Sequence, residues 1–237
     1  MVEAGDRKIA PVTASIESRL VYPAVNGPEI VRFGMSSQFY VLVTQDRLTR
    51  KPHPAEWMQQ HAPLTYAYLR PFEKPLLNRG SKQIKELAED TDFYAMFGIG
   101  DYSFAPYRVT WHRSTHSMAA VVLSMLRTPF GKREVIACDH AAFYPVAGLA
   151  EAHYLCGLMN SSHVDDFLGS ASPSAEIAPP GAVKPLAIPK FSPRDPLHNT
   201  LSTLSLKAHK LVKGRKPTKE IDCEINRAVA KLWSIES

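Results

Sequence analysis

The sequence predicts an α+β fold with a twisted, mostly antiparallel sheet, flanking helices and a C-terminal helical pair. Between residues 93 and 146, short runs of β-branched and aromatic residues alternate with glycine, proline and polar residues, which is typical of strands joined by turns. Before and after this region, apolar residues recur at the three- and four-residue spacing of helices. With 237 residues and 45% hydrophobic content, the chain can bury one good core.

The N-terminal part of the chain is predicted to hold one clear strand and several short helices. Pro71 and Pro75 are expected to kink or shorten one helix, because proline removes a backbone donor. Ser81 suits the position before another helix, where its side chain can accept from a free backbone N–H. Residues 1–15 are expected to be flexible. The expected elements are a strand at residues 39–43 and helices at residues 54–60, 65–77 and 82–88.

The middle of the chain is predicted to form the sheet. Gly98 and Gly100 permit a tight turn, and the Gly-x-Gly pattern there indicates a turn rather than a cofactor-binding loop. In the strand that follows, alternation sends Tyr107, Val109 and Trp111 to one face. Arg108 and Thr110 project from the other face. The expected strands are residues 93–97, 107–113, 119–123, 135–137 and 142–145.

The C-terminal part is predicted to be helical around one long loop. Residues 151–160 carry an apolar stripe that favours burial in the core. Residues 170–185 are rich in Ser, Ala, Pro and Gly, which indicates a surface loop. Asp195 is placed to cap a helix that starts at Pro196, and a last helix carries apolar residues from 221 to 232. These two helices are expected to pack on each other; packing against a partner's helix is the alternative.

We expect a flexible segment at residues 1–15, a recognition domain at 16–192 and a helical tail at 193–237. A cytoplasmic location is expected, since no apolar run approaches the roughly 20 residues that span a bilayer and no signal pattern starts the chain. Cysteines at 138, 156 and 223 lack Cys-x-x-Cys spacing, which favours free thiols. No metal ion or cofactor is expected.

Positive charge is concentrated in two places, although the formal net charge is only +5. Six cations lie within the thirteen residues from Lys207 to Lys219, with no acid among them. They could contact phosphates in any sequence context, or they could form a solvated helix end followed by a basic linker. The second cluster, residues 127–133, is predicted to be a loop or hairpin tip suited to a DNA groove; an ordinary exposed turn is the alternative.

Five blocks occur in the order typical of one family. They are I-E-S-R-L-V-Y-P-A-V-N-G-P-E-I (residues 16–30), P-L-T-Y-A-Y-L (63–69) with L-N-R (77–79), the glycine turn with Y-R-V-T-W (107–111), A-H-Y-L-C-G-L-M-N-S-S (152–162), and I-P-K-F (188–191) before a Leu-rich helix carrying His198. Together they resemble the target-recognition (specificity) domain of adenine-N6 DNA methyltransferases, as in TaqI-like methylases and Eco57I-like fused restriction–modification enzymes. The resemblance covers most of the chain.

The resemblance implies sequence-specific binding of double-stranded DNA beside a catalytic methyltransferase domain or subunit. Phosphate contacts would supply most of the affinity, and a few side chains in a groove would supply specificity. The residues expected to bind DNA are Arg108, His112 and Arg113 on the strand and its end, Lys132 and Arg133 on the loop, Lys82 and Lys85 as backbone contacts, and Lys207, Lys210 and Lys213 in the tail.

No catalytic residue is expected. An amino-methyltransferase of this class uses an Asn/Asp-Pro-Pro-Tyr/Phe loop, and the nearest strings, at residues 178–181 and 195–197, do not match it. We expect a separate specificity subunit, an excised domain or the remnant of a disrupted gene. A remnant would serve as a protein-interaction module with weak or no DNA specificity, and a small enzyme of unrecognised type is the third class.

Overall fold

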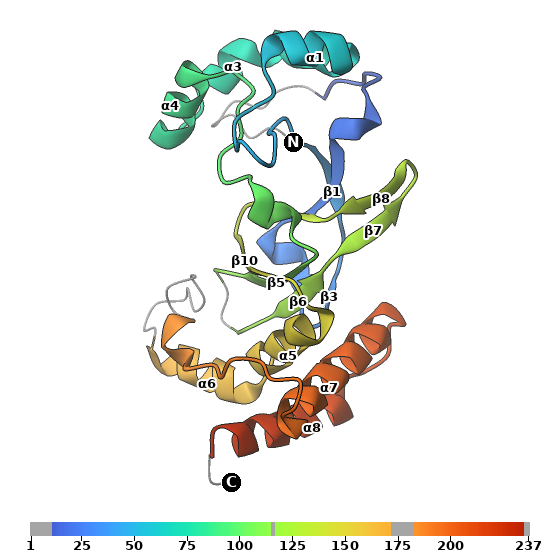
Figure 1. The fold of residues 1–237 in the computed structure, drawn as a ribbon, viewed down its shortest axis with the longest axis vertical. Helices are drawn as coiled ribbons and strands as arrows, with labels where there is room; N and C mark the ends of the chain where they lie inside the picture. Colours follow the sequence, from blue (N-terminus) through green and yellow to red (C-terminus); the bar gives the residue numbers. More distant parts are fainter. Residues whose placement is uncertain (1–10, 115–116, 172–182, 235–237) are drawn as a thin grey trace. The chain divides into compact units, whose positions relative to one another are not determined.

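The structure is a computed structural model that describes residues 11–114, 117–171 and 183–234 (Figure 1). Residues 1–10 of the predicted flexible segment 1–15, and residues 172–182 of the predicted loop 170–185, lie outside the described residues. The chain divides into two units: residues up to 22 with residues 40–104, and residues 23–39 with residues from 105 on. These boundaries differ from those expected at residues 15 and 192. The α+β class is confirmed.

The first unit is mainly helical. The strand predicted at residues 39–43 is present as β4 (Phe39–Leu42). The predicted helix at 65–77 is divided, because Pro71 lies in a 3-10 turn, η3 (Arg70–Phe72), that ends one helix before the next begins. The helices are α1 (Ala55–His61), α2 (Pro63–Leu69), α3 (Glu73–Leu77) and α4 (Lys82–Asp90); short 3-10 turns are η1 (Ser18–Leu20) and η4 (Asp101–Phe104).

The prediction of a strand at residues 93–97 is wrong. Side chains satisfy the backbone of this segment instead of a neighbouring strand. The Gln45 side chain both accepts from the Met96 N–H, at 3.0 Å, and donates to the Met96 carbonyl, at 2.6 Å. Thr44 Oγ1 donates to the Tyr94 carbonyl at 2.8 Å. The aromatic side chains of Phe93 and Tyr94 then join the core of the first unit, where Met58 is fully buried.

The second unit is built on a three-stranded antiparallel sheet in the order β10-β5-β6. Its strands are β10 (Ala141–Val146), β5 (Tyr107–His112) and β6 (Ala120–Leu123), as predicted within one or two residues. β1 (Val21–Val25) crosses the unit boundary, and its end pairs in parallel with β9 (Ile136–Ala137). Two antiparallel pairs complete the strands: β2 (Ile30–Val31) with β3 (Gly34–Met35), and β7 (Met125–Thr128) with β8 (Gly131–Glu134).

Helix α5 (Leu149–Met159) is the centre of the second unit. It lies against the three-stranded sheet, and α7 (Pro196–Lys213) and α8 (Lys219–Leu232) pack on its other side (Figure 1). Gly157 allows α5 and α7 to approach closely, because a Cβ there would lie 3.0 Å from the Leu201 carbonyl oxygen. Residues on all sides of α5 are therefore buried, beyond the single predicted stripe.

The remaining helices follow partly from the sequence. Asp195 caps α7 as predicted, accepting from the N–H groups of Leu197 and His198 at 2.8 and 3.3 Å. The predicted packing of the last two helices is confirmed, with Leu201 and Ile225 fully buried between them and the rest of the core. Helix α6 (Ser162–Ala171) and the 3-10 turns η2 (Gly27–Glu29) and η5 (Lys184–Leu186) were not predicted. In the described part of the chain, no helix combines the length and apolar character that crossing a bilayer requires.

Candidate nucleic-acid interface

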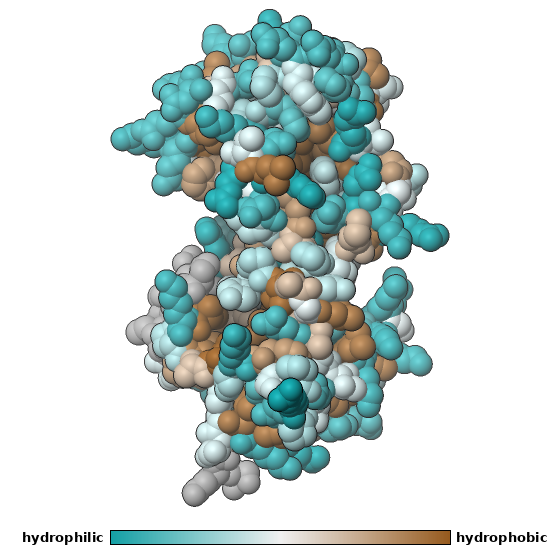
Figure 2. Space-filling model, in the orientation of Figure 1, coloured by the Kyte–Doolittle hydropathy of each residue, from teal (hydrophilic) through white to brown (hydrophobic). Residues whose placement is uncertain are grey.

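The excess positive charge belongs to the second unit. The first unit holds equal numbers of basic and acidic residues, so the formal charge of +5 lies entirely in the second. Within the second unit, cations are most concentrated in two segments, which we call the basic hairpin (residues 125–134) and the basic corner (residues 207–219). Figure 2 shows hydrophilic side chains projecting at the side of the molecule where Figure 1 draws the hairpin and the end of α7. This side is the best candidate for binding a polyanion.

The basic hairpin is a tight two-stranded ribbon. Thr128 pairs with Gly131 across a loop of only Pro129 and Phe130, and Thr128 Oγ1 donates to the Gly131 carbonyl at 2.6 Å. Gly131 has a φ of +109°, which only glycine adopts readily. This geometry closes a tight turn, and it agrees with the loop or hairpin tip predicted there.

Two cations of the basic hairpin face each other directly. Arg127 on β7 is the cross-strand partner of Lys132 on β8, and both side chains are exposed. Like charges in this position destabilise a pair of strands. Arg133 adds a third cation, with its guanidinium carbon 5.8 Å from the centre of the Phe130 ring. A bound anion would remove the repulsion between Arg127 and Lys132.

The basic corner joins α7 to α8. Helix α7 ends at Lys213, with Gly214 as its C-cap. The next two N–H groups turn back onto the helix: Arg215 donates to the Val212 carbonyl and Lys216 to the Leu211 carbonyl, each at 2.9 Å. This is the Schellman arrangement, which needs a left-handed residue at the position of Arg215. Arg215 takes that conformation with a φ of +54° although it is not glycine. The six cations of this corner are all exposed and form no ion pair with any residue that the structure describes.

Helix electrostatics explain only part of the basic corner. Lys210 and Lys213 lie in the last turn of α7, where the carbonyl end of a helix favours cations. Lys219, however, is the first residue of α8, where the N–H end of the helix disfavours a cation. The solvated helix end therefore accounts for two of these lysines and leaves the others without a structural reason.

The basic hairpin and the basic corner are held on either side of the β2–β3 ribbon. A Cβ on Gly34 would lie 2.5 Å from a methyl group of Val212, so β3 lies directly against the end of α7. The next residue, Met35, packs in the same apolar cluster as Leu126 of the hairpin. One continuous piece of the fold thus carries both groups of cations.

The prediction that Arg108 projects toward a ligand is wrong. Its exposed fraction is 0%, as is that of Thr110, and its Nη1 donates to the Ala105 carbonyl at 3.0 Å. β5 is the central strand of its sheet, with α5 on one face and η2 and β2 on the other, so neither face meets solvent. Burial lowers the pKa of Arg108 to about 10, against the opposing effect of Glu134. The predicted alternation is correct, but both faces are interior.

The other predicted DNA contacts fall in separate places. Arg113 is exposed and His112 half-buried at the far end of β5 from the hairpin, roughly 17 Å along the strand. Burial lowers the pKa of His112, and the nearby His140 adds to this effect. Lys82 and Lys85 lie on α4 in the first unit, where Lys82 pairs with Glu86 at 3.6 Å. Of the predicted set, Lys132 and Arg133 lie in the basic hairpin, and Lys207, Lys210 and Lys213 lie in the basic corner.

A buried polar cluster in the second unit contains His, Ser and Cys side chains. His153 Nδ1 lies 3.2 Å from Ser205 Oγ, and its ring packs edge-on against His209, with 4.7 Å between ring centres. Burial lowers the pKa of His153 to about 4 and raises that of the adjacent Cys156 thiol to about 12. A neutral thiol sealed from solvent is a poor nucleophile. These groups hold α5 and α7 together.

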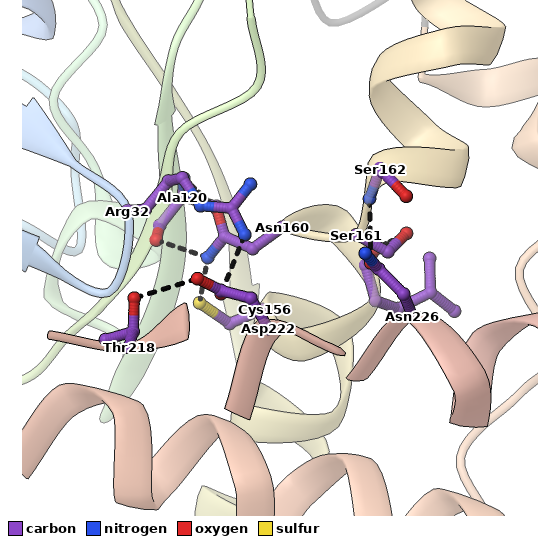
Figure 3. A network of polar contacts seen from close by, with 10 residues as sticks. Arg32, Ala120, Cys156, Asn160, Ser161, Ser162, Thr218, Asp222 and Asn226 are labelled. Atoms are coloured by element: carbon purple, nitrogen blue, oxygen red, sulfur yellow. Dashed lines mark hydrogen bonds and ion pairs between the residues drawn. The ribbon is translucent and has the colours of Figure 1, made fainter. Parts of the chain in front are cut away.

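The same region contains a network that ties loops to helices (Figure 3). Asn160, at the end of α5, accepts from the Ala120 N–H at 2.9 Å and donates to the Ala120 carbonyl at 2.8 Å, as a neighbouring strand would. Asp222 on α8 accepts from Arg32 and from Thr218, both at 2.9 Å. These bonds stabilise the edge of β6 and the start of α8, beside the basic corner.

The described residues supply no evident metal site. They contain no group of three or more His, Cys, Asp or Glu side chains arranged to hold an ion. The three cysteines are free thiols, as the spacing predicted. Comparison of the chain with protein-family models and with curated protein sequences finds no match. The resemblance to target-recognition domains therefore stays a prediction from the sequence blocks.

Proposed function

We propose that the second unit binds duplex DNA through the basic hairpin and the basic corner, as the target-recognition part of an adenine-N6 DNA methyltransferase or restriction–modification enzyme. The observation that carries DNA binding is the pair of cation groups in the second unit, one of which opposes the exposed Arg127 and Lys132 across two strands. The methyltransferase role rests on the five sequence blocks alone.

The two groups suit different contacts with a duplex. A two-stranded ribbon has the width to enter the major groove. We therefore assign contacts with base edges to Arg127, Lys132 or Arg133 of the hairpin. The basic corner is suited to phosphates, because lysine acts as a point charge that needs no fixed geometry. Corner contacts should therefore raise affinity for every duplex, and hairpin contacts should also select sequence.

The alternative role as a protein-interaction module receives less support. It requires the apolar faces of α7 and α8 to bury against another protein. Those faces are occupied in the second unit itself, since Leu201, Ile225 and Val229 are each fully buried. Where α7 meets α8, the exposed side chains include the six cations of the basic corner, which favours an anionic partner.

The test is binding of a labelled random-sequence duplex across a series of salt concentrations. The variants are Lys210→Ala with Lys213→Ala for the corner, and Arg127→Ala with Lys132→Ala for the hairpin. If each lost cation was a phosphate contact, either pair should reduce the slope of log affinity against log salt by about 1.8. Lys184→Ala with Lys190→Ala is the matched control, because it removes the same charge elsewhere in the second unit.

A pool of random duplexes, selected and sequenced, separates the two roles. The wild type should enrich a short motif, the corner pair should enrich the same motif more weakly, and the hairpin pair should lose it. Slopes that do not change in either pair, or that change equally in the control pair, would contradict the proposal. Salt-sensitive binding without enrichment would leave DNA binding standing and would refute sequence recognition by the isolated chain.

A further inference from the structure

A cavity of about 530 Å³ lies at the β10 edge of the three-stranded sheet. Its volume falls in the range of small-molecule sites. Three separate parts of the second unit form its walls: strands β5 and β10, one side of α5, and the segment from residue 183 to 191. The basic hairpin and the basic corner adjoin the opposite edge of the sheet, at β6. The cavity is therefore distinct from the candidate DNA surface.

The exposure of Tyr144 shows that this space is unfilled. Tyr144 is the register partner of Val109, so both side chains lie on the face of the sheet that packs on α5. Val109 is fully buried, but Tyr144 has an exposed fraction of 59%. A large aromatic side chain on the interior face of a sheet is normally covered. Tyr144 instead borders the cavity, so no protein atoms cover that part of its ring.

The wall opposite the sheet is fixed by polar bonds. Tyr154 on α5 donates its hydroxyl to the Pro189 carbonyl at 2.9 Å, and His198 Nδ1 accepts from the Ser192 N–H at 2.9 Å. The ring of Phe191 lies nearly parallel to that of His198, with 6.0 Å between their centres. These contacts hold the segment in place independently of any ligand. A preformed wall lowers the ordering cost of binding.

The lining combines aromatic surface with cations at its rim. Trp111, Phe143, Tyr144 and Phe191 contribute aromatic rings, and the aliphatic remainder comes largely from α5. Lys184 and Lys190 are exposed at the rim and form no ion pair with a described residue, and Glu151 is the one acid in the lining. The complementary ligand is a flat aromatic ring that carries a negative charge.

We propose that this cavity binds a nucleoside monophosphate, with its base against the aromatic side chains and its phosphate at Lys184 and Lys190. Every base has a face that stacks on an aromatic ring, and stacking contributes about 1–3 kcal/mol per base. The charge of the phosphate matches that of the two lysines. This site is independent of the proposed DNA surface, and it gives the protein a second ligand.

The test is isothermal titration of the full chain with each of the four ribonucleoside 5′-monophosphates. At least one should bind, and Lys184→Ala with Lys190→Ala should weaken it about tenfold or more, as expected for lost bonds to a charged group. Tyr144→Ala should weaken it by a factor of about 5 to 150 through lost stacking. Because Tyr144 is largely exposed, its replacement should leave the fold intact, which a melting curve checks.

Controls separate this site from the DNA surface and from other ligands. Lys210→Ala with Lys213→Ala should bind the nucleotide as the wild type does, and the Lys184/Lys190 pair should keep the wild-type salt slope with DNA. The parent nucleosides should bind more weakly, and inorganic phosphate should not compete. No binding of any of the four nucleotides would overturn the proposal. Equal binding of nucleosides, or binding of laurate in their place, would overturn it too.

Discussion

Replacing Arg215 with glycine is expected to stabilise the free protein and to weaken its binding to DNA. Arg215 holds a φ of +54° at the end of α7, in the place where most helices of this kind have glycine. The left-handed conformation costs a residue with a Cβ roughly 1–2 kcal/mol. Glycine removes this cost, but it also makes the unfolded chain more flexible, which takes back about 0.4–1 kcal/mol of the stabilisation. The net stabilisation should be about 0.5–1 kcal/mol.

Urea unfolding followed by circular dichroism measures the first effect, and the salt dependence of duplex binding measures the second. Arg215→Gly should also reduce the salt slope by about 0.9, the value for one phosphate contact. Lys216→Gly is the matched control, because it removes a neighbouring cation whose backbone φ is not positive. This variant should lower the affinity for DNA without raising the stability of the protein. If Arg215→Gly destabilises the protein, the argument from backbone strain is wrong. If it stabilises but leaves DNA binding unchanged, Arg215 does not contact the duplex.

Three further predictions concern the helices of the second unit. Asp195→Ala should cost about 0.5–2 kcal/mol of unfolding free energy, since it removes the cap of α7; urea unfolding checks this. Gly157→Val should cost about 1–3 kcal/mol by forcing α5 from α7, whereas Gly169→Ala, which meets nothing within 4 Å, should be neutral or stabilising by up to about 1 kcal/mol. His153 has a folded pKa of about 4, below its ordinary 6.5, so the unfolded state takes up its proton first as pH falls. Stability should therefore decline from about pH 6.5 toward pH 4, by about 3 kcal/mol from this group, and unfolding curves of His153→Gln should show a flatter profile.

Local rules predicted most elements of the second unit. The spacing of apolar residues and the Asp195–Pro196 pair gave both C-terminal helices, because the signals for those elements are contained within them. The strands of the main sheet followed in the same way from β-branched runs between turns. Residues 93–97 have a similar composition, yet they form no strand, because Thr44 and Gln45 supply their hydrogen bonds from fifty residues away. No pattern within the segment itself could reveal that.

The candidate sites show the same limit. The basic hairpin was visible as a charged run, but the direct opposition of Arg127 and Lys132 depends on the register of the turn. The error at Arg108 arose because alternation tells which residues share a face and does not tell what covers that face. The aromatic cavity had no signal at all, since Tyr144, Leu155 and Phe191 come from segments that only the fold brings together.

The two parts of the candidate DNA surface share a property that an ordinary solvated surface does not require. In the hairpin, Arg127 and Lys132 repel each other across the strands. In the corner, Arg215 occupies a strained backbone conformation where glycine would be favoured. Each feature lowers the stability of the free protein, and each keeps a cation exposed and unpaired. A polyanion bound across both places would remove the repulsion and give the strained arginine a partner, so the stability lost in the free chain would be recovered in the complex.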